Sequence, residues 1–289
     1  MRHGNCAMLA LLFCAGWTGS ALAGESYDSC TGFIDALPAS ITAPGTWCLR
    51  KDLVLKRASG IAVWIKADDV TLDCNGNTLD GSYGGAGTIA DGIYGSDRHN
   101  ITVRHCEVRG FEYGLRLSGD DGGMHVVEDN RFSGNTHMAV YVAGDGSTVR
   151  RNDVIDTGAS TVAADAIAEG IAARMSVDII DNTVSGVAGA TSGVGSAYGI
   201  YTRFNDGGTI AGNRIRGLVA GGSGVVRGID NVDSGRVVVD GNNVVGDDGA
   251  GSIGIRCSTD RGRVRGNVTL GFGTGIAACG DSGGNVGDN

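Results

Sequence analysis

The chain has 289 residues, with 23 Lys and Arg against 32 Asp and Glu, and a formal net charge of −9 at pH 7. Such an acidic surface is repelled by a phosphate backbone, so we expect no nucleic-acid partner. Fifty-two glycines with only two prolines indicate many turns and exclude a collagen-like composition.

Residues 1–23 have the features of a secretory signal peptide. Arg2 precedes an apolar run from Cys6 to Trp17, and Ala21-Leu22-Ala23 forms a small-residue cleavage site. The run is too short to span a bilayer stably, and no later segment is apolar enough to do so. We therefore expect a secreted or periplasmic protein without a membrane span, in which residues 24–60 form an N-terminal cap and residues 61–289 the main domain.

The main domain consists of a repeat. A small residue followed by an aliphatic one recurs every 21 to 31 residues, at Gly92-Ile93, Gly114-Leu115, Ala139-Val140, Gly170-Ile171, Gly199-Ile200, Gly228-Ile229, Gly254-Ile255 and Gly275-Ile276. A second fixed point follows each of the first seven pairs, at Cys106, Asn130, Asn152, Asn182, Asn213, Asn242 and Asn267. Three residues before each of these lies an aliphatic residue, at Val103, Val127, Val149, Ile179, Ile210, Val239 and Val264.

Each repeat unit contains short β-branched stretches separated by turns and no helical pattern. A unit of this size cannot bury its apolar face alone, so the units must stack. Stacking places identical positions ~4.8 Å apart, and inward asparagines can then hydrogen-bond to one another from coil to coil. The repeat therefore predicts a solenoid of about eight or nine coils, in which the asparagines are structural.

Two stretches at the start, "ITAPGTWCLRKDLVL" (41–55) and "GIAVWIKADDVTLDCNGNTLDG" (60–81), resemble the cap and first coil of the right-handed parallel β-helix proteins of the pectate-lyase-like superfamily. The resemblance extends over nearly all of the chain after residue 23 and implies an all-β, right-handed parallel β-helix. It does not imply one activity, because this superfamily includes polysaccharide lyases, glycosidases, epimerases and proteins without known catalysis.

Six cysteines remain after the signal peptide, and an even number in an exported chain indicates disulfides. We expect Cys30–Cys48 to close the cap, while Cys74–Cys106 and Cys257–Cys279, each about one coil apart, join successive coils. The sequence alone does not exclude other pairings. The last coil leaves little room for a cap, and a bare end exposes unpaired strand edges. Either the C-terminal end, joined by the expected Cys257–Cys279 disulfide, remains exposed to solvent, or a second subunit covers it by self-association.

One face of the solenoid is expected to carry function. If the aliphatic residue of each pair points inward, the next residue points outward. These positions, with those just before the small residue and two residues further along, are rich in Tyr and Arg. The substrate-binding candidates are Tyr94, Arg116, Tyr141, Tyr198, Arg227 and Arg256. An acidic protein that concentrates Arg and Tyr on one face is suited to an acidic polysaccharide. The alternative is that Tyr is simply favoured in strands and that Arg pairs with nearby carboxylates.

The three longest coils are consecutive, with extra residues around 156–168, 185–197 and 216–226. These bulges would wall a groove beside the catalytic candidates Glu169, Arg174, Tyr201, Arg203 and Asp230. They are also explained by drift, since surface insertions cost little.

Three functions fit these residues. β-Elimination of a uronate needs its carboxylate neutralised and a base to remove the α-proton; Arg174, Arg203 or Arg227 would neutralise and Tyr201 would be the base. Hydrolysis needs two carboxylates, and Glu169 and Asp230 lie two coils apart, ~9–10 Å by stacking, near the upper limit for an inverting pair. The third is a non-catalytic polysaccharide-binding or adhesive solenoid. The leading hypothesis is binding, with eliminative cleavage, of an acidic polysaccharide.

A series of aspartates follows the same strands, and most are explained as Asp-Gly turn residues. Calcium is the one candidate cofactor, because it accepts carboxylate oxygens readily; its candidate ligands are Asp120, Asp121 and Asp145. Among the histidines, His137 near Tyr141 is the one candidate base.

Overall fold

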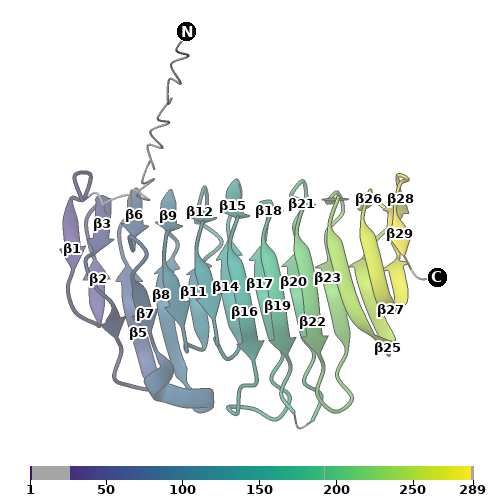
Figure 1. The fold of residues 1–289 in the computed structure, drawn as a ribbon, viewed down its shortest axis with the longest axis horizontal. Coiled ribbons are helices and arrows are strands. Elements are labelled where there is room, and N and C mark those ends of the chain that lie inside the picture. The colour runs from purple at the N-terminus through teal and green to yellow at the C-terminus, as the bar shows by residue number, and fades with distance from the viewer. Residues whose placement is uncertain (2–26, 192, 288–289) are drawn as a thin grey trace.

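The computed structural model describes residue 1, residues 27–191 and residues 193–287, and the expected signal peptide lies almost entirely outside these residues. The chain forms a right-handed parallel β-helix in which every pairing between strands is parallel (Figure 1). One short 3-10 helix, η1 (Ser82–Gly87), is the only helix of the described chain. No helix in that part is long and apolar enough to cross a bilayer.

A complete coil contributes one strand to each of three faces. Sheet 1 contains β1 (Gly32–Ile34), β3 (Gly45–Leu49), β6 (Val70–Asp73), β9 (Ile101–Arg104), β12 (Val126–Glu128), β15 (Ser147–Arg150), β18 (Val177–Ile180), β21 (Thr209–Ala211), β24 (Val238–Asp240), β26 (Arg263–Arg265) and β28 (Gly280–Asp281). Sheet 2 contains β4 (Leu53–Val54), β7 (Thr78–Asp80), β10 (Glu107–Arg109), β13 (Arg131–Ser133), β16 (Asp153–Gly158), β19 (Thr183–Ala188), β22 (Arg214–Val219) and β29 (Val286–Gly287). Sheet 3 contains β2 (Ala39–Ile41), β5 (Ser59–Ile65), β8 (Ile89–Ser96), β11 (Tyr113–Ser118), β14 (Met138–Ala143), β17 (Ala168–Arg174), β20 (Ala197–Arg203) and β23 (Val226–Val232).

Two long strands, β25 (Asn243–Cys257) and β27 (Val268–Ala277), run through both sheets 2 and 3 and join them. Sheet 1 has eleven strands, more than the eight or nine coils expected from the repeat. The difference arises partly because residues 24–60, expected as a cap, also contribute β1 to β4, which pair in register with later coils.

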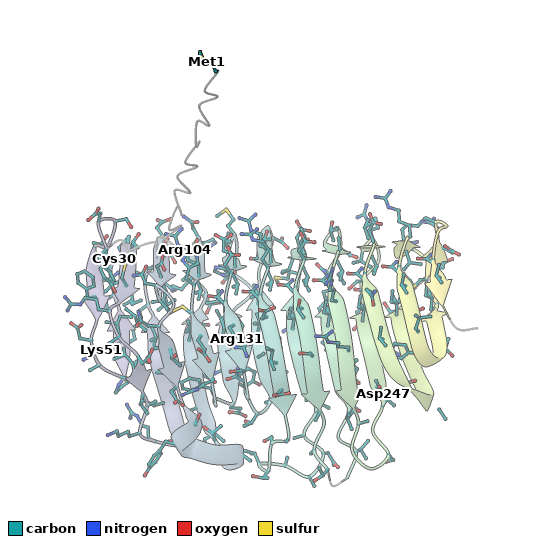
Figure 2. All side chains as sticks on the ribbon, in the orientation of Figure 1. Met1, Cys30, Lys51, Arg104, Arg131 and Asp247 are labelled. Atoms are coloured by element: carbon teal, nitrogen blue, oxygen red, sulfur yellow. A yellow bond between two sulfur atoms is a disulfide. The ribbon has the colours of Figure 1, made fainter. Side chains whose placement is uncertain are left out.

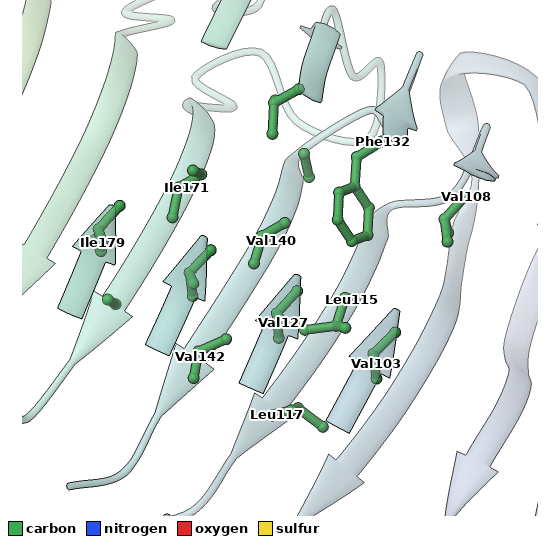
Figure 3. Close-up of a cluster of buried hydrophobic side chains, with 14 of the residues drawn as sticks. Val103, Val108, Leu115, Leu117, Val127, Phe132, Val140, Val142, Ile171 and Ile179 are labelled. Carbon is green, nitrogen blue, oxygen red and sulfur yellow. The ribbon is translucent and has the colours of Figure 1, made fainter. Parts of the chain in front are cut away.

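The core is a set of stacked aliphatic columns (Figure 3). In sheet 1, Val103 pairs with Val127, which pairs with Val149, and the column continues through Ile179 to Val264. All the members of this column are completely buried. The expected inward positions are therefore confirmed, and the burial of a continuous apolar stack stabilises each coil against its neighbours.

The small residue of each pair points inward together with the aliphatic one. A Cβ on Gly170 would lie 2.5 Å from Val184 Cγ1 and 2.6 Å from the carbonyl oxygen of Gly199. Only a small residue fits there, and the strand bends at this point because two successive residues face the core. This contact explains why the small-aliphatic pair recurs in every coil.

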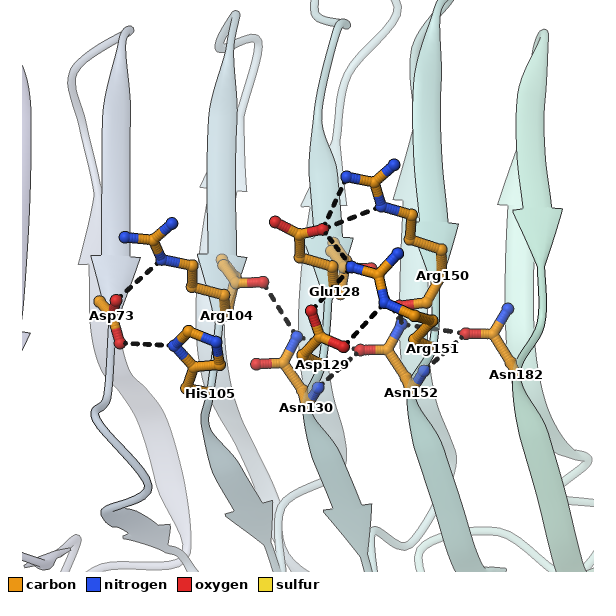
Figure 4. A network of polar contacts seen from close by, with 12 residues as sticks. Asp73, Arg104, His105, Glu128, Asp129, Asn130, Arg150, Arg151, Asn152 and Asn182 are labelled. Carbon is orange, nitrogen blue, oxygen red and sulfur yellow. Dashed lines mark hydrogen bonds and ion pairs between the residues drawn. The ribbon is translucent and has the colours of Figure 1, made fainter. Parts of the chain in front are cut away.

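The asparagine ladder is confirmed. At the corner between sheets 1 and 2, the Asn130 Nδ2 donates to Asn152 Oδ1, and Asn152 donates in the same way to Asn182, with N–O distances of 3.0 Å (Figure 4). The ladder continues to Asn285 through the members Asn213, Asn242 and Asn267. All three expected disulfides also form, with Cα–Cα distances of 5.9, 4.7 and 5.0 Å for Cys30–Cys48, Cys74–Cys106 and Cys257–Cys279.

Charged side chains project from most coils (Figure 2), and many arginines pair across to the neighbouring coil. On sheet 1, Arg104 Nε lies 2.8 Å from Asp73 Oδ2, and Arg150 and Arg151 both lie 2.8 Å from Glu128 Oε2 (Figure 4). On this face, therefore, most arginines form ion pairs with a neighbouring coil.

Candidate functional site

Three outward columns run along sheet 3, as expected. The first column, before the small residue, consists of Asp91, Tyr113, Met138, Glu169, Tyr198 and Arg227. The second column consists of Trp64, Tyr94, Arg116, Tyr141, Ala172, Tyr201, Asp230 and Arg256. The third column includes Lys66, Ser96, Ser118, Ala143, Arg174 and Arg203. Neighbouring coils thus place these side chains ~4.8 Å apart along the solenoid.

Glu169 is the most unusual side chain on this face. It lies in β17, is only 3% exposed, and its carboxyl has no hydrogen bond or ion pair with the residues that the structure describes. Burial, with a further contribution from the charge of Asp230, raises the pKa of Glu169 to about 8. The side chain is therefore mostly protonated at neutral pH and can donate a proton.

Asp230 lies on β23 and is also buried, but its carboxylate has a partner. Arg256 donates through Nε at 2.6 Å and Nη2 at 2.9 Å, which forms a two-pronged ion pair. The two carboxyl groups of Glu169 and Asp230 thus have opposite environments, one apolar and one paired with a cation. Environments that separate two acids in this way are typical of acid–base sites.

The register corrects the expected spacing of this pair. Glu169 and Asp230 lie two strands apart, but Asp230 is also displaced by three residues along the strand, because Glu169 aligns with Arg227 through Tyr198. Their Cα atoms are therefore up to about 14 Å apart in extended geometry, rather than the stacking distance alone. Any pair chemistry requires both side chains to reach toward a substrate between them.

Two tyrosines lie between these acids. Tyr198 neighbours Glu169 in the first column, Tyr201 neighbours Asp230 in the second, and their rings meet edge to face with centroids 5.4 Å apart. Burial raises the pKa of both phenols, and the charge of Glu169 contributes to the rise for Tyr201. The protonated phenol is thereby favoured and can donate a hydrogen bond; the role of base expected for Tyr201 remains a prediction.

A second polar cluster lies nearer the N-terminus on the same face. Arg116 Nη2 lies 2.5 Å from Asp91 Oδ2, and its guanidinium carbon lies 4.7 Å from the ring centroids of Tyr94 and Tyr113. Burial raises the pKa of Asp91 to about 6, against the opposing effect of Arg116. His137 packs its ring edge-on to Tyr113, with centroids 5.2 Å apart.

His137 itself is fixed by a contact with the backbone, and the role of base expected for it remains a prediction. Its Nδ1 lies 2.9 Å from the Ile167 carbonyl oxygen, two residues before Glu169, and burial lowers its pKa. This contact anchors the segment that leads into β17.

The three columns carry six cationic side chains among the described residues. Three are ion-paired: Arg116 with Asp91, Arg203 with Asp233 at 3.0 Å, and Arg256 with Asp230. The other three lie free of carboxylates: Lys66 over the Trp64 ring at 3.9 Å, Arg174 beside Phe204, and Arg227 on the carbonyls of Val226 and Gly251. With Glu169 protonated, this face has a local excess of positive charge.

The long loops lie along one edge, where η1 and the loops after β16, β19 and β22 project together (Figure 1). Thr161 N donates to the Ala86 carbonyl oxygen in η1 at 3.0 Å, and Val194 N donates to Asp165 Oδ1 at 2.9 Å. The expected bulges therefore support one another as a continuous wall just before the first column.

The aspartate series is not a continuous column. Asp145 Oδ1 accepts from Ser176 N at 3.1 Å, while Asp178 lies in sheet 1, where it accepts from Thr209 N. Asp120 and Asp121 are exposed on a loop in which Gly123, rather than either aspartate, aligns with Asp145. Among the described residues no three His, Cys, Asp or Glu side chains gather as metal ligands.

Trp64 and Lys66 were not among the candidates taken from the sequence. Ala62-Val63 occupies the place of the small-aliphatic pair in β5, because Val63 aligns with Ile93. The signal that could have found it is the pair Ala139-Val140, which shows that alanine replaces glycine elsewhere in the repeat.

Several solved structures share this fold. The chain aligns with the A-module of the mannuronan C-5 epimerase AlgE4 from Azotobacter vinelandii at a TM-score of 0.53 and 13% identity, covering 90% of this chain and 89% of that one. Pectate lyase Pel9A gives a TM-score of 0.52 at 14% identity, over 82% of this chain and 70% of that one. The Dettilon tailspike protein gp208 gives 0.52 at 11% identity over 85% of this chain, which spans 60% of the tailspike chain.

At these identities the solved structures establish the fold alone. No curated protein sequence matches the chain. A family model does: "Periplasmic copper-binding protein (NosD)" matches residues 49–231, more than half of the chain and most of the coils that build sheet 3. The chain, with its stacked β-helical coils, therefore belongs to the NosD family.

Proposed function

We propose that the protein binds an acidic polysaccharide along sheet 3 and cleaves it at the cluster of Glu169, Tyr198, Tyr201 and Asp230. The observation that carries the proposal is the charge of this face. Lys66, Arg174 and Arg227 are free of carboxylates, in a chain whose net charge is −9. A local cationic stripe on an acidic protein attracts a polyanion to that face, while the rest of the surface repels it.

The aromatic side chains support a sugar ligand. Tyr94, Tyr141 and Tyr201 share the second column, and a flat ring with a polar tip suits the apolar face and hydroxyl edge of a sugar. A chain lying along the solenoid axis would cross a new strand every ~4.8 Å. The wall formed by the long loops would limit its sideways movement. The glycan-linked names of two of the structural neighbours, a pectate lyase and a mannuronan epimerase, are consistent with this ligand class.

The chemistry follows from the two acids. Protonated Glu169 would donate its proton to the leaving glycosidic oxygen, and the carboxylate of Asp230 would remove the α-proton of a uronate as the carbon–oxygen bond breaks and a double bond forms. Arg174 or Arg227 would neutralise the uronate carboxylate. Tyr201 would hydrogen-bond to the sugar. Elimination is favoured over hydrolysis because the cations without carboxylate partners are suited to neutralise the uronate carboxylate.

Hydrolysis by the same pair is the second candidate. The specific observation in its favour is that burial raises the pKa of Glu169 while Asp230 is paired with Arg256, as in glycosidases where one acid donates and the other activates water or attacks. The products distinguish the two reactions, since only elimination leaves an unsaturated end.

The test uses the purified chain with pectate, alginate, hyaluronan and uncharged xylan, with calcium or with chelator. Binding is measured by affinity electrophoresis, and unsaturated and reducing ends are recorded separately. We expect retardation by at least one acidic polymer and unsaturated ends that are lost in Glu169→Gln while binding persists. Glu107→Gln, on sheet 2, is the matched control. Equal retardation by xylan, or none by any acidic polymer, would refute the proposal; reducing ends alone would favour hydrolysis.

Calcium enters the proposal through the chelator arm. Asp120, Asp121 and Asp145 are its candidate ligands, and the first two are exposed on one loop. Loss of turnover in chelator, restored by calcium and weakened in Asp121→Asn, would assign them as ligands. Unchanged turnover would leave Asp145 as the turn residue that its bond to Ser176 N makes it.

The family description also names copper, whose preferred protein donors are Cys, Met and His. All six cysteines of the described chain are in disulfides. The Nδ1 atoms of His105, His125 and His137 are engaged with Asp73, Ile101 N and the Ile167 carbonyl, and Met124, Met138 and Met175 lie in three different coils. These contacts leave the Nε2 atoms available, but among the described residues no three His, Cys, Asp or Glu side chains gather as metal ligands, so no clustered donor set supports copper binding.

A further inference from the structure

Trp64 extends the second column beyond the residues that the repeat marks. It lies in β5 beside Tyr94, and 40% of its surface is exposed. A single exposed apolar side chain is ordinary on a protein surface, but Trp64 adjoins the ring of Tyr94, and contiguous exposed apolar patches mark ligand-binding surfaces. A short turn connects β5 directly to β6, so no long loop follows Trp64 in the chain.

The surroundings of Trp64 combine a flat surface with positive charge. Its ring lies 6.1 Å from that of Tyr94 at an interplanar angle of 59°, and Lys66 Nζ lies 3.9 Å from its centroid. Tyr94 in turn packs against Arg116. Lys66 has no ion pair with a described carboxylate, so its ammonium group, which lies over one face of the Trp64 ring, is available to an anion beside that ring.

Trp64 lies far from Glu169 along the solenoid, so Trp64 and Lys66 cannot take part in the reaction itself. From β5 the sheet passes through β8, β11 and β14 before it reaches β17. Four strand spacings separate Trp64 from the Glu169 strand by ~19 Å along the solenoid. A ligand that touches both must therefore be a chain of several sugars, and Trp64 is too far away to act on the reacting bond.

We propose that Trp64 and Lys66 form a distal subsite for an acidic sugar of the polysaccharide, with the sugar face on Trp64 and Tyr94 and its carboxylate on Lys66. This inference rests on the proposed function, because it takes the same polymer along the same sheet. It deepens that function by assigning the end of the binding surface toward the N-terminus and by making affinity depend on chain length.

The test measures dissociation constants for uronate oligosaccharides of increasing length, from a disaccharide to a dodecasaccharide of the polymer that the wild-type chain retains. Trp64→Ala should weaken binding of the longest oligosaccharides by roughly tenfold, in line with one lost stacking anchor, and should weaken the disaccharide much less. Lys66→Ala should reduce the salt dependence of binding to the long ligands. Val238→Ala, an exposed apolar residue of β24 on sheet 1, is the control and should bind all lengths as the wild type does.

The outcomes separate this inference from the proposed function. If the wild-type chain binds long acidic oligosaccharides and Trp64→Ala binds them equally well, the distal subsite is refuted and the proposed function stands. A loss of equal size at every length would also refute it, since that result indicates damage to the whole face. If the wild-type chain binds no acidic oligosaccharide, the proposed function itself fails. Circular dichroism at matched temperature confirms that each variant is folded.

Discussion

Residues on sheet 3 differ in how their charges are satisfied, and this difference defines the site. A buried carboxyl without a cationic partner favours its neutral form, whereas a buried carboxylate held by a guanidinium favours its charged form. Glu169 is the first case and Asp230 the second; they lie two strands apart, on the two strands that flank β20. A buried acid with a pKa raised as that of Glu169 is belongs to a class of residues enriched at functional sites.

The first prediction concerns the pH dependence of turnover. If Glu169 is the proton donor, kcat/KM should fall about tenfold per pH unit above its pKa of about 8, because only the protonated form donates. Glu169→Gln should lower turnover at neutral pH by ~10²–10⁴-fold. Initial rates from pH 5 to 10 on the retained polymer check this, and an alkaline limb that is unchanged in Glu169→Asp would contradict the assignment.

The second prediction concerns His125, a buried residue of the core. Its Nδ1 accepts from Ile101 N at 3.3 Å, and burial, with the nearby charge of His99, lowers its pKa to about 4 from 6.5. Asp68 opposes this only in part. The unfolded chain therefore binds more protons than the folded one between pH 6.5 and 4, so stability should be lost as pH falls through that window, by ~1.4 kcal/mol per unit at most.

Urea unfolding at pH 7 and pH 4.5 tests this. His125→Asn keeps a side-chain acceptor but removes the proton site, so the difference in the free energy of unfolding between the two pH values should shrink in the variant. The same difference in both proteins would assign the acid sensitivity to other groups.

From the coil of Asn130 onward, the strands are held in register by two structural features. The bend at the small-aliphatic pair aligns sheet 3, and the asparagine ladder aligns the corner between sheets 1 and 2. In the ladder each amide also donates to a carbonyl of the preceding coil; Asn182 Nδ2 lies 2.9 Å from the Val149 carbonyl oxygen. A ladder of this kind leaves almost no buried polar atom unpaired at the corner, which is what an interior position requires.

The third prediction compares two positions of the ladder. Asn182→Ala removes bonds to Asn213 and Val149 and leaves the Asn152 amide without its acceptor, so it should lower the free energy of unfolding by ~2–4 kcal/mol. Asn285→Ala, at the more exposed end of the ladder, should cost clearly less. Urea midpoints of the two variants check this, and equal losses would show that the ladder does not act through burial.

For the whole molecule, the consequence of this architecture is that each coil touches only its neighbours. Stability is then close to a sum of coil and interface terms, and the ends are the weakest points. Cys257–Cys279 joins β25 to the residues after β27, close to the C-terminal end. A disulfide there opposes fraying of the last coils, while β5 to β23, which carry most of the proposed glycan-binding face, precede these coils.

The fourth prediction follows from that position. Replacing both Cys257 and Cys279 by alanine should lower the free energy of unfolding by ~2–4 kcal/mol, the usual value for a short closed loop. Hydrogen exchange should rise first in β26 to β29 and leave β17 and β20 protected, with polysaccharide binding retained. A uniform rise of exchange over all coils would show instead that the solenoid unfolds as one cooperative unit.

The solenoid could be inferred from the sequence alone. Small-aliphatic pairs, inward aliphatics, turn asparagines and one-coil cysteine spacings are local features that repeat, and stacking identical units leaves essentially one way to bury them together. The outward columns of sheet 3 follow from the same alternation, which is why Glu169, Tyr201 and Asp230 could be placed on one face in advance. The candidate face was thus predictable; the state of its charges was not.

The state of those charges depends on how the coils pack in three dimensions. Whether Arg203 meets Asp233 or a substrate, and whether Glu169 is left without a partner, depends on side-chain reach between coils. The offset between Glu169 and Asp230 depends on register along the strand, and Trp64 joins the second column through an alanine-valine pair that the glycine pattern passes over. These properties arise from contacts between residues about 30 positions apart. The local sequence determines the length of each coil and which residues face inward, but not which outward side chains of neighbouring coils contact one another.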